Sequence, residues 1–113
     1  MKLYGIKTCG SVRKAIKFFN ENSIEFEFID FKKTDIDEKS INYWLTKVSI
    51  EKLFNNKGTK YRTLKLKELN LDDSAKKAWL IKENMLIKRP VIEHKESVIV
   101  AFDEELYKAT FLG

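Results

Sequence analysis

The chain of 113 residues contains a single cysteine, Cys9, and the position of this thiol is the first pointer to chemistry. Cys9 lies between a short apolar segment that ends at Ile6 and a helical pattern that starts near Ser11. Backbone N–H groups at the start of a helix carry partial positive charge, which stabilises a thiolate over a thiol. Such a position can lower the pKa of a cysteine well below its usual value of about 8.5. The placement therefore predicts a nucleophilic thiol.

The alternative is a structural cysteine, because a lone free cysteine most often fills space in a core. The residues around Cys9 argue against a core position, since they are polar or small: Lys7, Thr8, Gly10 and Ser11. Lys7 and Arg13 flank the thiol, and we expect their positive charges to favour the thiolate and to attract an anionic substrate. A reactive Cys9 is the favoured interpretation.

Arginine is rare in this chain, with three residues (Arg13, Arg62 and Arg89) against 19 lysines. A lysine-rich chain retains arginine where the planar guanidinium, with its several N–H donors, is needed to bind an anion. Three arginines are also compatible with chance positions on the surface. Arg89 is the most informative, because it precedes the only proline, Pro90, at the start of a predicted strand. The bond between them is either cis in a tight turn or trans at the first residue of a strand, and local sequence allows both.

The elements that must position these residues begin with a strand, a helix and a strand. Lys2–Ile6 has the pattern of a strand, and apolar residues at helical spacing predict a helix over Ser11–Glu21. Glu25–Phe31 alternates apolar and acidic residues, which is the period of a strand. This βαβ order predicts two parallel strands joined by a right-handed crossover.

A helical insertion at about 35–84 follows, with a cap-like Thr34, a turn at Asn55–Gly58, a loop or short extended piece at 60–69 and a helix capped by Asp72 and Asp73. Two strands around a polar turn at 94–97 and a helix capped by Asp103 complete the chain. The order βαβ, helical insertion, ββα predicts an α/β fold with a mixed four-stranded sheet flanked by helices. This is a thioredoxin-like plan in a single domain, residues 1–113.

Composition narrows the classes of function. Basic residues (22) are interleaved with acidic ones (17), so the net charge of +5 indicates a solvated surface rather than a nucleic-acid site. No apolar run approaches the roughly 20 residues of a membrane span, and no secretory signal is visible. One cysteine allows no internal disulfide, and one cysteine with one histidine cannot supply a common structural zinc site. We therefore expect a cytoplasmic protein without a membrane, nucleic-acid or metal partner.

Four segments resemble the arsenate reductase (ArsC)-like family, which includes the YffB proteins and the Spx regulators: "YGIKTCGSVRKA", "NNKGTKYRTL", "MLIKRPVIE" and "VIVAF". The resemblance runs in order over essentially the whole chain. It implies a thioredoxin-like fold, a catalytic Cys9 and an anion-binding Arg89 beside a cis Pro90. It also implies that Arg62 corresponds to an anion-binding arginine of the family's insertion.

Two departures from the family pattern bear on activity. Arsenate reductases similar to this family use a third arginine downstream of the Arg-Pro strand, and "HKESVIVAFDEELYK" contains none. Spx regulators usually carry Cys-x-x-Cys, whereas Val12 stands here in place of the second cysteine. The departures argue against arsenate reduction and against an intramolecular disulfide switch.

The resemblance thus implies a monothiol oxidoreductase without a bound cofactor, in which Cys9 attacks a small anionic substrate or an oxidised sulfur. Glutathione or another low-molecular-weight thiol would resolve the product, with glutaredoxin as a further partner. An Spx-like transcription regulator that binds RNA polymerase is the alternative, because one fold hosts both functions. A degenerate member with neither activity is a third reading.

Overall fold

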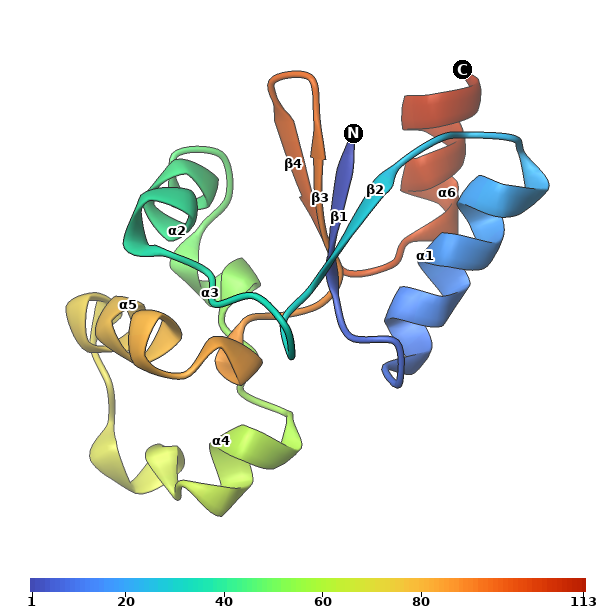
Figure 1. The fold of residues 1–113 in the computed structure, drawn as a ribbon. Coiled ribbons are helices and arrows are strands. Elements are labelled where there is room, and N and C mark those ends of the chain that lie inside the picture. The colour runs from blue at the N-terminus through green and yellow to red at the C-terminus, as the bar shows by residue number, and fades with distance from the viewer.

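The computed structural model describes residues 1–113, and its central feature is a mixed four-stranded sheet (Figure 1). The strands are β1 (Lys2–Gly5), β2 (Glu27–Asp30), β3 (Val91–His94) and β4 (Ser97–Val100), in the spatial order β2-β1-β3-β4. Strands β1 and β2 are parallel, while β1 with β3 and β3 with β4 are antiparallel. The sequence-based prediction of a thioredoxin-like α/β fold is confirmed.

Strand alternation divides the apolar side chains between two cores. On β1, Leu3 faces one core and Tyr4 the other, and on β3 Ile92 and Val91 divide in the same way. Helix α1 (Gly10–Glu21) and the C-terminal helix α6 (Glu104–Tyr107) lie on one side of the sheet (Figure 1). A helical turn at 108–112 extends α6. The helical insertion lies on the other side.

The insertion contains four short helices: α2 (Glu38–Leu45), α3 (Ile50–Leu53), α4 (Thr59–Thr63) and α5 (Asp73–Lys82). Two 3₁₀ turns, 66–69 and 84–86, follow α4 and α5. The prediction of a loop or short extended piece at 60–69 was wrong, because α4 and the 3₁₀ turn at 66–69 cover most of this segment. No helix of the chain combines the length and the apolar content that crossing a bilayer requires.

Side-chain caps define where several helices begin. Asp72 and Asp103 each accept a backbone N–H of the helix that follows, as the sequence predicted. The first insertion helix is different, because Asp37 and not Thr34 is its cap, with Asp37 Oδ1 accepting the Ser40 N–H at 2.8 Å. The prediction of Thr34 as a cap was wrong, because the helix begins only at Glu38, directly after Asp37.

A half-buried carboxylate joins the insertion to the sheet. Glu93 of β3 accepts the indole N–H of Trp44 at 2.6 Å and the hydroxyl of Tyr4 at 3.3 Å. Burial, together with the Glu93 charge, raises the pKa of Tyr4 above its ordinary value, so the phenol stays a donor. Trp44 is fully buried, and its ring packs edge-on against Tyr4. These contacts hold α2 on the sheet.

Ala101, just after β4, adopts a left-handed backbone conformation with φ of 71°. Its N–H donates to the Pro90 carbonyl at 2.8 Å, and its own carbonyl accepts the Tyr107 hydroxyl at 2.9 Å. These bonds tie the start of β3 to the C-terminal helix. A side chain with a Cβ is disfavoured in this conformation, whereas glycine adopts it freely.

We expect Ala101→Gly to raise the free energy of unfolding by about 1 kcal/mol, because it removes the Cβ strain and leaves both hydrogen bonds in place. Urea denaturation followed by tryptophan fluorescence measures the change. Ala78→Gly, on the exposed side of α5, is the matched control and is expected to lower stability by about 1 kcal/mol. A destabilised Ala101→Gly variant would contradict the strain argument.

Candidate active site around Cys9

Cys9 is the residue that caps the N-terminus of α1. Its backbone is extended (φ −79°, ψ 128°), and its carbonyl accepts the Arg13 N–H at 3.0 Å. In this position a serine or aspartate side chain would accept N–H groups from the first turn of the helix. Here the Cys9 side chain makes no capping hydrogen bond, but the N–H groups of Val12 and Ser11 act on its sulfur to lower the pKa of the thiol.

Opposing effects set the pKa of Cys9. Burial of the sulfur raises the pKa, because it disfavours the charged form. The N–H groups of Val12 and Ser11, together with the hydrogen bond and positive charge of Arg89, outweigh burial and lower the pKa below its ordinary value. The thiolate is thus favoured at a pH where a free cysteine would remain protonated.

Arg89 is anchored by the backbone that leads to it. Its Nη1 donates to the carbonyls of Met85 at 2.8 Å and Ile87 at 3.3 Å, and the Arg89–Pro90 peptide bond is cis. Its Nε is the only buried side-chain nitrogen or oxygen of the chain without a hydrogen-bond partner. The guanidinium therefore retains a desolvated donor that an anion can satisfy.

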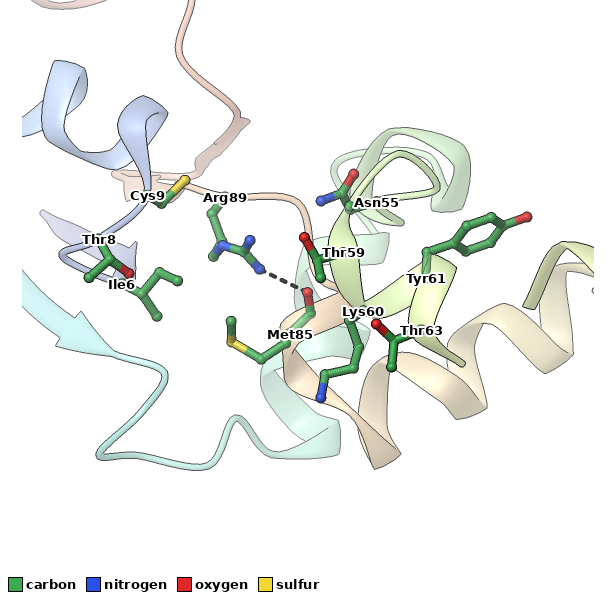
Figure 2. A pocket seen from close by; sticks show the side chains of 11 residues that line it. Ile6, Thr8, Cys9, Asn55, Thr59, Lys60, Tyr61, Thr63, Met85 and Arg89 are labelled. Atoms are coloured by element: carbon green, nitrogen blue, oxygen red, sulfur yellow. Dashed lines mark hydrogen bonds between the residues drawn. The ribbon is translucent and has the colours of Figure 1, made fainter. Parts of the chain in front are cut away.

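A cavity of about 390 Å³ lies beside these two residues and is large enough for a small-molecule ligand. Three segments far apart in the sequence form its walls: the loop from β1 to α1, the region of α4, and the end of the insertion (Figure 2). The lining side chains are mostly small or polar, and none is acidic: Ile6, Thr8, Cys9, Asn55, Gly58, Thr59, Lys60, Tyr61, Thr63, Met85 and Arg89.

The structure brings Cys9 and Arg89 together but separates Lys7 and Arg13 from them. Both are exposed, and neither lines the cavity. The Lys7 ammonium lies 5.9 Å from the centre of the Phe28 ring, and Arg13 Nε donates to the Lys7 carbonyl at 3.0 Å. Neither side chain is among the groups that shift the pKa of Cys9, so an action of their charges on the thiol or on an anionic substrate stays a prediction.

Arg62 is also outside the cavity. Its Nη1 donates to the Lys57 carbonyl at 2.7 Å and its Nη2 to Thr59 Oγ1 at 3.5 Å, so the guanidinium closes the turn before α4. Lys60, two residues earlier, lines the cavity instead. Side chains two positions apart on a helix point in different directions, so only one of the two lines the cavity.

Sequence reasoning missed the polar wall opposite the thiol. Asn55 and Gly58 come from the predicted turn, but nothing in the sequence showed that this turn faces Cys9. The two residues are in close contact: a Cβ added at Gly58 would lie 2.6 Å from Asn55 Nδ2. The turn cluster itself was the only signal that could have pointed to this wall.

Known proteins resemble this chain over nearly its whole length. The model of the ArsC family matches residues 4–110. The chain belongs to the ArsC family. A protein of Haemophilus influenzae described as uncharacterized is 31% identical over 110 residues, with 96% of each chain covered.

Two solved structures extend this comparison. The YFFB protein is similar with a TM-score of 0.88 at 29% identity, covering 96% of each chain. An arsenate reductase (ArsC) related protein from Brucella melitensis is similar with a TM-score of 0.75 at 30% identity, covering 97% of this chain and 92% of that one. Membership in the ArsC family and the thioredoxin-like fold support a role like that of a thiol oxidoreductase.

We expect Arg89→Gln to slow alkylation of Cys9 by iodoacetamide at neutral pH. The substitution removes the positive charge that favours the thiolate, so the alkylation rate falls by roughly tenfold, the size of one charge-assisted hydrogen bond. The pKa of Cys9 is lowered in the folded protein, so the wild-type alkylation rate should fall only at a pH below the pKa of a free thiol. The pH profile of the Arg89→Gln rate should move to higher pH. Mass spectrometry of samples quenched at a series of times and pH values measures the alkylation rate and its pH profile.

Lys88→Ala is the control for Arg89→Gln, because Lys88 is adjacent and does not line the cavity. Its alkylation profile is expected to match that of the wild type. Equal slowing in the two variants would mean that general positive charge, and not the Arg89 guanidinium, acts on Cys9.

Cys9 occupies the N-cap position of α1, so serine and alanine at this position are expected to differ in their effect on the free energy of unfolding. Serine is among the best N-terminal capping residues, whereas alanine offers no acceptor. Cys9→Ser is therefore expected to be more stable than Cys9→Ala by about 1 kcal/mol in urea denaturation. Equal stabilities would show that the N–H groups of Ser11 and Val12 do not depend on the side chain at position 9.

Proposed function

We propose that the protein is a monothiol oxidoreductase that exchanges disulfides at Cys9, with glutathione or another low-molecular-weight thiol as co-substrate. The observation that carries the proposal is that a thiol with a lowered pKa lines the same cavity as Arg89, whose buried Nε has no hydrogen-bond partner. The chain has no second cysteine, so every disulfide that Cys9 forms joins it to another molecule.

The reaction has two exchange steps. The Cys9 thiolate attacks one sulfur of a disulfide, the S–S bond breaks, and the departing thiolate takes a proton from water. An external thiolate then attacks the mixed disulfide and releases the Cys9 thiolate together with a second disulfide. Over one cycle one disulfide and one external thiol become a new disulfide and a new thiol, so the number of disulfide bonds is unchanged and no other oxidant or reductant is needed.

Each group around the thiol has a role in this scheme. The N–H groups of Ser11 and Val12 stabilise the Cys9 thiolate both as the attacking group and as the departing group of the second step. The Arg89 guanidinium holds an anionic part of the substrate next to the sulfur. Its anchors at Met85 and Ile87 fix its orientation before the substrate arrives. A glutaredoxin is the expected macromolecular thiol that accepts the mixed disulfide.

Intact-mass spectrometry tests this function. Native protein incubated with oxidised glutathione is expected to gain one glutathione per chain at Cys9, and dithiothreitol should remove it. Cys9→Ser is the matched control and should gain none. If neither oxidised glutathione nor any other small disulfide modifies the native wild-type protein, Cys9 is a structural residue and the proposed function fails.

A further inference from the structure

Lys60 is the second cationic side chain of the cavity and is not used by the proposed exchange reaction. It lies on α4, across the cavity from the loop that carries Cys9. Its ammonium points away from both Cys9 and Arg89 (Figure 2). Arg89 and Lys60 are the only charged residues that line the cavity. The lining therefore offers two separate positions for negative charge and no acidic side chain to repel it.

The Lys60 ammonium already forms an ion pair with Glu83. Its Nζ lies 3.7 Å from Glu83 Oε1, and the two side chains retain 40% and 31% of their solvent exposure. A half-exposed pair at this separation is weak, so a carboxylate that enters the cavity can replace Glu83. Glu83 does not line the cavity itself. Its other carboxylate oxygen accepts the N–H of Met85 at 3.4 Å, which keeps Glu83 close to the backbone that anchors Arg89.

We propose that Lys60 is a specificity-determining residue: it binds a carboxylate that the substrate carries at a distance from its reacting sulfur, and Glu83 is the internal group that this carboxylate displaces. The inference rests on the proposed exchange at Cys9 and names the substrate class. The substrate is an extended disulfide with at least two negative groups, one bound by Arg89 and the other by Lys60. Compact or cationic disulfides are disfavoured.

Geometry supports an extended ligand over a compact oxyanion. The cavity volume of about 390 Å³ exceeds the needs of a single tetrahedral anion, which Arg89 alone would hold beside the sulfur. Asn55, Thr59 and Thr63 also line the cavity, and their amide and hydroxyl groups can hydrogen-bond a peptide-like backbone that extends from Cys9 toward Lys60.

The experiment compares two small disulfides of opposite charge. Oxidised glutathione carries net negative charge and cystamine carries net positive charge, and both report the rate of mixed-disulfide formation at Cys9 by intact mass. Lys60→Ala is expected to slow the reaction with oxidised glutathione by about threefold and to speed the reaction with cystamine by a similar factor. The ratio of the two rate constants should therefore fall by roughly tenfold.

Glu83→Gln is expected to shift this ratio in the opposite direction. The amide keeps an acceptor for the Met85 N–H but no longer holds the Lys60 ammonium, so oxidised glutathione should react about threefold faster. In the double variant Lys60→Ala/Glu83→Gln this gain should disappear, because Glu83 acts through Lys60. A gain that persists in the double variant would overturn the competition between Glu83 and the substrate.

Lys67→Ala is the matched control for charge. It removes one positive charge from the exposed surface of the insertion and lies outside the cavity. Its rate ratio is expected to stay within about 1.5-fold of the wild type. A fall in the ratio as large as that of Lys60→Ala would reduce the effect to net charge and overturn the inference.

The test also separates this inference from the proposed function. If wild-type Cys9 reacts with both disulfides and Lys60→Ala leaves their rate ratio unchanged, disulfide exchange stands and the role of Lys60 is wrong. If wild-type Cys9 reacts with neither disulfide, the proposed function itself fails. Tryptophan fluorescence and urea denaturation of each variant show that the rates refer to folded protein.

Discussion

The site depends on one arginine that backbone carbonyls hold in place. Met85 and Ile87 accept two hydrogen bonds from the Arg89 guanidinium, and the group reaches Cys9 from the segment that links the insertion to β3. Without these anchors, a contact of the guanidinium with the sulfur or with an anion would cost the conformational entropy of ordering a long side chain. The backbone contacts restrict that freedom in advance, so the Arg89 guanidinium is oriented beside the cavity before any ligand binds.

The same segment also places the opposite wall of the cavity. The Asn55 N–H donates to the Leu86 carbonyl at 2.8 Å, and the Lys88 N–H donates to the Leu53 carbonyl at 2.7 Å, so the end of α3 pairs with the chain that leads to Arg89. The turn that carries Asn55 and Gly58 is thereby fixed relative to Arg89. On the other side of the insertion, Glu93 binds Trp44 and holds α2 against the sheet. The insertion is thus part of the active-site framework.

Local sequence was a good guide where the chemistry is local. Cys9 caps α1 because a polar loop separates an apolar strand from an amphipathic helix, and this is visible from the residues alone. The order of elements and the pairing of β1 with β2 follow from hydrophobic periods and from the handedness of βαβ crossovers. The thiol and its helix were therefore predictable, and so was the thioredoxin-like fold.

Groups that act across the cavity were not predictable in the same way. Lys7 and Arg13 are near Cys9 in sequence but interact with Phe28 and a backbone carbonyl, while Arg62 closes a turn. Lys60, with no distinguishing pattern among 19 lysines, lines the cavity because of the rotation of α4 about its axis. The rotation of α4 depends on which apolar residues of the insertion pack into the core. That packing joins segments about 30 to 80 residues apart in the sequence, and the local spacing of residues does not encode such contacts. The sequence by itself determined a capping thiol, an Arg-Pro strand and the order of elements, whereas tertiary packing alone decided which cations share a cavity with the thiol.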